Sequence, residues 1–287
     1  MADDPGAFVE HRISAGDGLS LYVRDYGDAG STQTPVLCLG GLTRNSKDYH
    51  AVARRLAPQR RVIAPDYRGR GKSDYDPDWR NYQPPTYLDD LRHILIALGI
   101  HEVVVIGTSM GGLLAAGMTA AMPTVLKGVV LNDVGPVVDR TGLKPIIDYM
   151  RGASAFPGWA EATNALRRAF PDFPAETDEQ WRAIAGATYR EGTDGQVRFD
   201  WDPDIVKPLE KDTSPRYDFW PLFHGLTPLP ALVLRGELST ILPAELMAEM
   251  AEALPNLATA TVSGVGHGPC LSEPEALEAL DGFFRRV

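Results

Sequence analysis

The chain has 287 residues, of which 44% are hydrophobic and 23% are charged, and its formal net charge is −10. These proportions are ordinary for a globular protein that buries a sizeable core. The negative charge argues against a protein that binds the phosphate backbone of nucleic acids, because such proteins present a basic face. We therefore expect no nucleic-acid partner.

The N-terminal residues and the cysteine content bear on where the protein works. The opening MADDPGAFVEHR is acidic and lacks the apolar stretch of a signal peptide, and no apolar run approaches the length of a membrane span. Cys38 and Cys270 are the only cysteines, too few for a disulfide framework or a Cys-rich metal site. We expect a cytoplasmic protein with no membrane partner and no metal ion.

The first predicted element is a hairpin, and a series of apolar strands follows it. Residues 9–27 alternate apolar and polar side chains around a Gly-Asp-Gly turn. Later runs rich in Val, Ile and Leu end at Gly, Pro or Asp, and they cover residues 35–41, 60–69, 101–107, 127–135, 230–236 and 258–268. Such runs are typical of strands buried on both faces of a mostly parallel sheet.

Helical patterns alternate with these strands. They cover residues 46–58, 86–100, 243–255 and 273–287. The first is predicted to begin at Ser46 as its N-cap and to end at Pro58. Alternation of this kind predicts an α/β fold, with a mostly parallel central sheet and helices on both of its faces.

The alternation stops at about residue 135. Up to residue 215 the chain has helical pieces with many aromatic residues and no comparable strand runs. This break predicts a helical cap over residues 136–215, inserted into an α/β core formed by residues 1–135 and 216–287. The alternative is that these helices only thicken the core.

Residues 107–111 read Gly-Thr-Ser-Met-Gly, which matches the G-x-S-x-G pattern. The pattern carries meaning where a strand precedes it and a helix follows, because the serine then sits on a strained turn with its hydroxyl exposed. The runs EVVVI and GLLAAGMTAAM supply both. We predict Ser109 as a nucleophile, the alternative being a simple Gly-rich turn.

A serine nucleophile requires a histidine base. Five of the six histidines lie in helices, in the hairpin or beside strands, where a structural or surface role explains them most simply. His267 lies instead in a Gly-rich loop between the last predicted strand and the last helix. This loop reaches the carboxyl edge of the sheet, where Ser109 is expected, so we predict His267 as the base.

An oxyanion hole requires two backbone N–H groups. The turn at Ser109 supplies that of Met110. The loop after the first parallel strand contains Gly40 and Gly41, which allow the backbone to curl, and we predict the N–H of Leu42 as the second donor.

With these motifs in chain order, the sequence resembles the α/β-hydrolase superfamily, in its capped branch. The resemblance covers nearly the whole chain and rests on LGGLTRNSKDY, DYRGRGKSDY, GTSMGG, LNDVGP, LVLRGELSTILP and GVGHGPCLSEP. It implies a Ser–acid–His triad in that chain order, which maps onto Ser109 and His267, and an oxyanion hole at Leu42 and Met110. It also implies no cofactor.

One further motif and one departure follow from the resemblance. The segment DYRGRGKS is similar to a structural turn of the family, in which Asp66, Arg68 and Gly71 brace a loop and do no chemistry. Many members carry His before the glycine of the oxyanion loop, where this chain has Gly40, and the loop loses a side-chain hydrogen bond there.

The larger departure concerns the triad acid. In the family it usually lies three or four residues after the glycine that here is Gly236, but these positions hold Ser239 and Thr240. Asp133, at the end of the preceding predicted strand, is the preferred replacement, because some members place the acid there. Glu237 is the second choice, and a site without an acid is the third.

The residues together predict a serine hydrolase acting on an apolar small molecule with a reactive carbonyl. A carboxylic ester or lactone suits this machinery, and cleavage of a C–C bond in a β-diketone-like substrate is also open. Gly41, Tyr149, Trp159 and Trp181 are predicted to line the substrate pocket. The alternatives are a small-ligand-binding protein and a cofactor-free lyase or cyclase that uses His267 as base. The sequence does not predict the oligomeric state.

Overall fold

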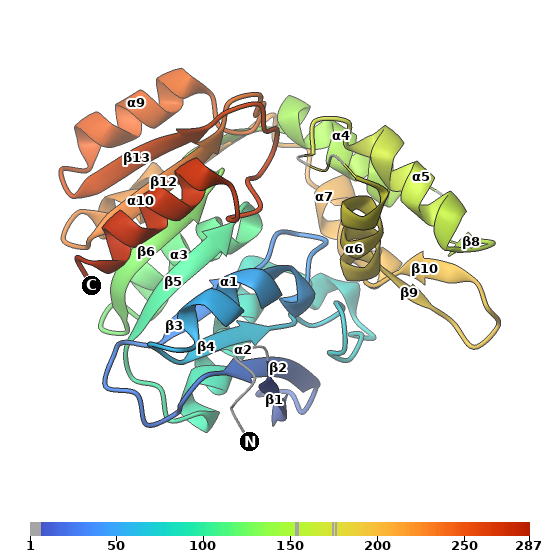
Figure 1. The fold of residues 1–287 in the computed structure, drawn as a ribbon, viewed down its shortest axis with the longest axis horizontal. Helices are drawn as coiled ribbons and strands as arrows, with labels where there is room; N and C mark the ends of the chain where they lie inside the picture. The colour runs from blue at the N-terminus through green and yellow to red at the C-terminus, as the bar shows by residue number, and fades with distance from the viewer. Residues whose placement is uncertain (1–6, 153–154, 174, 176) are drawn as a thin grey trace.

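A computed structural model describes residues 7–152, 155–173, 175 and 177–287. Its centre is an eight-stranded sheet in the order β1-β2-β4-β3-β5-β6-β12-β13 (Figure 1). The strands are β1 (Phe8–Ser14), β2 (Ser20–Tyr26), β3 (Val36–Leu39), β4 (Val62–Pro65), β5 (Val103–Thr108), β6 (Leu126–Asn132), β12 (Ala231–Gly236) and β13 (Leu257–Val262). β1 and β2 pair antiparallel, as does β2 with β4, and the other pairs are parallel.

The parallel strands β3, β4, β5, β6 and β12 are buried on both faces, as predicted, whereas β13 lies at the edge of the sheet and is partly exposed. All four residues of β3 are fully buried, but alternate side chains point to opposite sides. Leu37 and Leu39 belong to one hydrophobic cluster, and Val36 and Cys38 belong to the other. The sheet therefore divides the core into two layers, and each requires a cover of helices.

Helices cover the two layers. They are α1 (His50–Leu56), α2 (Pro84–Ala97), α3 (Met110–Ala121), α9 (Ala244–Ala253) and α10 (Pro274–Phe284). α1 and α10 contribute buried residues to the layer that contains Cys38, and α2, α3 and α9 contribute to the layer that contains Leu37. Within the described ranges no helix is both long enough and apolar enough to cross a membrane.

The first helical segment starts differently from the prediction. Residues Ser46–Tyr49 form a short 3-10 helix, η1, which runs into α1. Its N-cap is Asn45 and not Ser46, because the Asn45 side chain accepts a hydrogen bond from the Lys47 N–H at 3.1 Å.

The chain between β6 and β12, over its described residues, adds no strand to the central sheet. Its elements are β7 (Val137–Asp139), α4 (Arg140–Met150), β8 (Ala155–Phe156), α5 (Trp159–Ala169), α6 (Asp178–Thr188), β9 (Tyr189–Glu191), β10 (Val197–Phe199), η3 (Pro203–Val206), α7 (Lys207–Lys211), β11 (Arg216–Asp218), α8 (Trp220–Phe223) and η4 (His224–Leu226). Most of it stands to one side of the sheet (Figure 1). We refer to residues 136–215 as the inserted segment. Its treatment as a separate cap stays a prediction, and residues 153, 154, 174 and 176 lie outside the described part.

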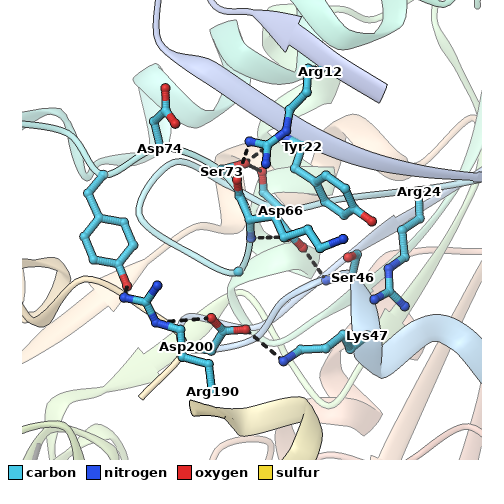
Figure 2. Close-up of a pocket in the computed structure, with 13 residues that line it drawn as sticks. Arg12, Tyr22, Arg24, Ser46, Lys47, Asp66, Ser73, Asp74, Arg190 and Asp200 are labelled. Atoms are coloured by element: carbon cyan, nitrogen blue, oxygen red, sulfur yellow. Dashed lines mark hydrogen bonds and ion pairs between the residues drawn. The ribbon is translucent and has the colours of Figure 1, made fainter. Parts of the chain in front are cut away.

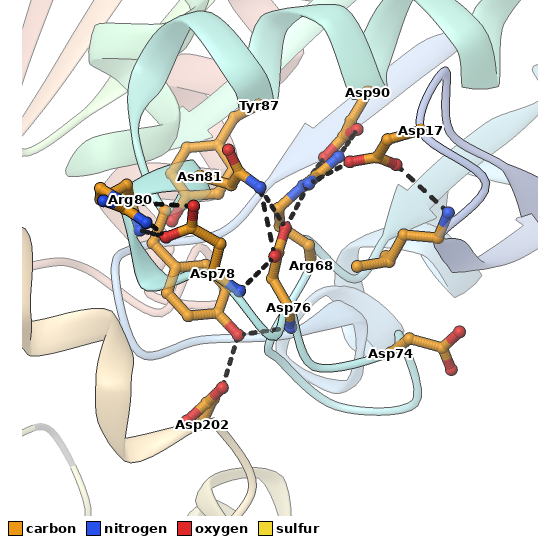
Figure 3. A network of polar contacts seen from close by, with 12 residues as sticks. Asp17, Arg68, Asp74, Asp76, Asp78, Arg80, Asn81, Tyr87, Asp90 and Asp202 are labelled. Carbon is orange, nitrogen blue, oxygen red and sulfur yellow. Dashed lines mark hydrogen bonds and ion pairs between the residues drawn. The ribbon is translucent and has the colours of Figure 1, made fainter.

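A buried arginine braces the loop after β4. Arg68 is 2% exposed and binds Asp90 through two hydrogen bonds, Asp76 at 2.5 Å and Asp17 at 2.8 Å (Figure 3). These carboxylates lie in α2, in the loop and in the hairpin turn between β1 and β2, so one guanidinium joins three parts of the core. Burial raises the pKa of the Asp90 carboxyl, and the hydrogen bonds from Arg68 oppose this shift.

The neighbouring Asp66 supports the same loop. Its carboxylate accepts the N–H groups of Ser46 at 2.7 Å and Lys72 at 2.8 Å. Gly71 has a φ of 54°, and a Cβ there would lie 2.1 Å from Asp66 Oδ2. Only glycine fits this position, and the predicted bracing of the loop is confirmed.

Candidate active site

Ser109 lies on the turn between β5 and α3. Its φ of 52° and ψ of −116° are strained for a residue with a side chain. Its N–H donates to the Asn132 carbonyl at 3.0 Å, which fixes the turn to the end of β6. A Cβ at Gly107 would lie 2.5 Å from the carbonyl carbon of Gly111, and one at Gly111 would lie 2.0 Å from the Leu39 carbonyl oxygen. Packing thus requires both glycines of the pattern.

His267 lies between Ser109 and Asp133. Its Nε2 is 3.0 Å from Ser109 Oγ, and its Nδ1 is 2.6 Å from Asp133 Oδ2. The loop that carries it follows β13 and lies against the end of β12, where a Cβ at Gly236 would be 2.1 Å from the Gly266 carbonyl oxygen. The three side chains therefore form a continuous hydrogen-bonded chain across residues remote in sequence.

Asp133 is fully buried and is held by three donors. Its Oδ1 accepts the Gly236 N–H at 3.0 Å. Its Oδ2 accepts the Ser239 hydroxyl at 2.5 Å in addition to His267. Because a buried carboxylate is costly without hydrogen bonds, this arrangement stabilises the charged acid beside the imidazole.

Glu237, the alternative acid, lies elsewhere. Its side chain is exposed, and its carboxylate accepts the Gly264 N–H at 2.8 Å. None of its contacts among the described residues is with His267. The residue next to Gly236 points out of the turn, so the expectation that Glu237 could replace the acid is not supported by its contacts.

The predicted oxyanion loop lies directly beside Ser109. A Cβ at Gly41 would be 3.7 Å from the Ser109 Cβ. Over the described residues, neither the Leu42 N–H nor the Met110 N–H makes a hydrogen bond. The Met110 N–H belongs to the first turn of α3, where backbone donors have no partner within the helix and the helix dipole favours negative charge.

Residues 44–47, after this loop, contact the inserted segment. Arg44 binds Asp48 and donates to Thr188 Oγ1 at 2.7 Å. Asn45 donates to the Ala187 carbonyl at 3.0 Å, and Lys47 donates to the Gly186 carbonyl at 2.9 Å. Asn45 and Lys47 also reach Asp200. We call these contacts the α6 tether. No local sequence pattern indicates them.

The predicted pocket residues of the inserted segment have partners within it. The Tyr149 hydroxyl lies 2.8 Å from that of Tyr189, and burial raises the pKa of Tyr149. Trp159 donates to Glu191 at 2.9 Å. Trp181 is 8% exposed and packs against Phe173 and Arg167. These contacts give Trp159 and Trp181 a packing role, and their place in a substrate pocket stays a prediction.

A cavity of about 550 Å³ lies elsewhere, between the N-terminal strands, the loop after β4 and the inserted segment (Figure 2). Its charged lining residues are Arg12, Arg24, Lys47, Lys72, Arg190, Asp66, Asp74 and Asp200. Asp200 and Lys47 form an ion pair at 2.8 Å. The cavity includes neither Ser109 nor His267. Sequence reasoning missed it, because its residues come from distant segments.

The two cysteines, Cys38 and Cys270, are free thiols in the structure. Burial raises the pKa of Cys270 to about 12, and the nearby Glu273 adds to the shift. Over the residues described, no three His, Cys, Asp or Glu side chains converge in a way that could hold a metal ion.

Several of the known proteins that this chain resembles are described as hydrolases. A family model described as "alpha/beta hydrolase fold" matches residues 34–274. The chain is 31% identical to a 3-hydroxybutyrate-oligomer hydrolase of Cupriavidus necator over 91% of both chains. It is 27% identical to a 2-(acetamidomethylene)succinate hydrolase of Mesorhizobium japonicum, over 96% of this chain and 95% of that protein. A solved structure from Novosphingobium aromaticivorans, 42% identical, superposes with a TM-score of 0.90 over 98% of this chain and 99% of the other.

Proposed function

Because the chain belongs to the α/β-hydrolase fold family, we propose that it is a serine hydrolase whose nucleophile is Ser109. The observation that carries the proposal is the pair of contacts made by His267, 3.0 Å to Ser109 Oγ and 2.6 Å to Asp133 Oδ2. A serine hydroxyl within reach of an imidazole, which is itself oriented by a buried carboxylate, has the geometry required for nucleophilic catalysis.

In the proposed reaction the Ser109 oxygen attacks the substrate carbonyl carbon while His267 Nε2 accepts its proton. The carbonyl oxygen becomes negatively charged and accepts hydrogen bonds from the N–H groups of Leu42 and Met110. The tetrahedral intermediate then expels the alcohol, which takes the proton from His267, and leaves an ester on Ser109. Water attacks this ester with His267 again as base, and the acid is released.

We propose a carboxylic ester or lactone as the substrate, with cleavage of a related C–C bond as the second choice. The Cupriavidus relative is named for 3-hydroxybutyrate oligomers, whose units are joined by ester bonds. The Mesorhizobium relative is named for a succinate derivative and is also called a hydrolase. Linear esters of short hydroxy acids are therefore the first compounds to test, followed by lactones and β-diketones.

The contacts of Asp133 weaken the alternative of a ligand-binding protein. That alternative depends on the lack of an acid at residues 239 and 240. The carboxylate of Asp133, directly after the neighbouring strand β6, lies 2.6 Å from His267 Nδ1. This contact supports the proposal that Asp133 orients His267 for catalysis.

The proposal is tested by labelling and by turnover. A fluorophosphonate should label Ser109 stoichiometrically, and Ser109→Ala should abolish both the labelling and the hydrolysis of p-nitrophenyl acetate. Ser263→Ala is the matched control, because Ser263 is an exposed serine in the loop that carries His267. A folded wild-type protein that is neither labelled nor active would refute the proposal. Activity that persists in Ser109→Ala would show that no acyl-enzyme on Ser109 is needed, and would favour the alternative in which His267 acts as base without acylation.

A further inference from the structure

The hydroxyl of Ser239 donates a hydrogen bond to the carboxylate of Asp133. Ser239 is 8% exposed and lies in the turn after β12, where its N–H donates to the Gly236 carbonyl at 3.0 Å. Its Oγ lies 2.5 Å from Asp133 Oδ2, the same oxygen that contacts His267 Nδ1. The hydroxyl and the imidazole therefore share one acceptor atom.

The surroundings of Ser239 fix the direction of this hydrogen bond. Its Oγ accepts the N–H groups of Ile241 at 3.2 Å and Leu242 at 3.3 Å. A hydroxyl has one proton and two lone pairs. With both lone pairs occupied by backbone donors, its proton is directed at Asp133. Ser239 is thus a fixed donor and not a freely rotating one.

The carboxylate requires such a donor because its own torsion is soft. Rotation about the bond between the carboxylate and the Cβ of an Asp has a broad minimum, so packing and hydrogen bonds decide where each oxygen points. Gly236 N–H holds Oδ1, and Ser239 holds Oδ2. Both donors lie at the end of β12, whereas Asp133 follows β6. The neighbouring strand therefore aims the acid at His267.

Resting on the function proposed above, we propose that Ser239 is a positioning residue of the active site, which holds Asp133 Oδ2 in line with His267 Nδ1. In this chain the carboxylate and its donor occupy two adjacent strand ends. A carboxylate at both places would bring two negative charges into contact in a buried site, which is unfavourable. A hydroxyl at residue 239 avoids this contact and satisfies the acid.

The test compares Ser239→Ala, Ser239→Cys and Ser239→Thr with wild type in p-nitrophenyl ester hydrolysis. Loss of a hydrogen bond to a charged group corresponds to about a tenfold to hundredfold change. We expect kcat to fall by that factor in Ser239→Ala with KM nearly unchanged, because Ser239 touches the acid and not the substrate. Ser239→Thr keeps the hydroxyl and should keep most of kcat, whereas Ser239→Cys should resemble the alanine variant because a thiol is a weak donor.

Thr240→Ala is the control, since Thr240 is the exposed neighbour in the same turn. Folding of each variant is followed by circular dichroism and thermal unfolding. If Ser239→Ala unfolds, the nearly isosteric Ser239→Cys decides the question. A folded Ala or Cys variant whose kcat stays within threefold of wild type would overturn the proposal, as would a Thr variant no better than Ala. An inactive, unlabelled wild type would overturn the proposed function instead, so the two failures are distinguishable.

Discussion

Replacement of Asp133 by Asn tests the proposed acid most directly. The carboxylate accepts hydrogen bonds from Gly236 N–H on one oxygen and from Ser239 and His267 on the other. An asparagine has almost the same shape but has one oxygen acceptor and one NH₂ donor. Three hydrogen-bond donors therefore face an amide in which only the oxygen can accept a hydrogen bond.

Either orientation of the amide disturbs the site. With its oxygen toward His267, the NH₂ group meets the Gly236 N–H at the place of a 3.0 Å hydrogen bond. With the NH₂ group toward His267, Nδ1 has to accept a hydrogen bond, so the neutral imidazole carries its proton on Nε2. The Nε2 atom can then no longer accept the proton of Ser109. Both orientations also remove the charge that stabilises the imidazolium.

We expect kcat for p-nitrophenyl acetate to fall by about 10³- to 10⁴-fold in Asp133→Asn, as in other triads that lose the acid. This corresponds to about 4–5.5 kcal/mol of transition-state stabilisation. KM should change little. Glu237→Gln is the matched control, because that carboxylate is exposed and binds Gly264, and its activity should match wild type. Asp133→Asn activity within tenfold of wild type would refute the assignment of the acid, and so would an equal loss in both variants.

Three further variants or measurements follow from the structure. Asp133→Ser combined with Ser239→Asp moves the carboxylate to the neighbouring strand end and should recover at least tenfold in kcat over Asp133→Ser alone; no recovery would show that the two positions are not equivalent. Arg68→Ala leaves buried carboxylates unpaired and should lower the free energy of unfolding by about 3–5 kcal/mol in urea denaturation, whereas the exposed Arg80→Ala should change it by less than about 0.5 kcal/mol. Since burial raises the pKa of Cys270 to about 12, its thiol should stay protonated at pH 8. Iodoacetamide should then modify it much more slowly in the folded protein than in urea, and equal rates by mass spectrometry would contradict the raised pKa of Cys270.

The parts of the fold that sequence predicts well are those with local patterns. The runs around Cys38 and Val105 indicate strands buried on both faces, because no polar residue interrupts them. The glycines around Ser109 indicate a tight turn between a strand and a helix. The loop that carries His267 follows a predicted strand of a parallel sheet, so His267 is expected at the carboxyl edge, near Ser109. Hydrogen-bonding distances among Ser109, His267 and Asp133 agree with that expectation, while their catalytic roles stay predictions.

The features that sequence does not predict depend on packing between distant segments. In the sequence, Ser239 is notable only because it stands where the family usually has the triad acid. Its contact with Asp133 depends on how β6 pairs with β12, which a local pattern does not give. The choice between Asp133 and Glu237 needs the direction of each side chain, which a single residue position does not give. Asn45 replaces Ser46 as N-cap because its side chain reaches the Lys47 N–H.

The α6 tether restricts how the inserted segment could swing open. Arg44, Asn45 and Lys47 follow the turn that carries Leu42, and they hold the last residues of α6. Asn45 is 2% exposed and Asp200 is 6% exposed, so pulling this edge away would strip buried polar groups of their partners. The tethered edge is therefore the part of the inserted segment that would be costly to separate from the core. Through Arg44, Asn45 and Lys47, the same contacts also join the end of α6 to the chain segment that directly follows Leu42, one of the two proposed oxyanion donors.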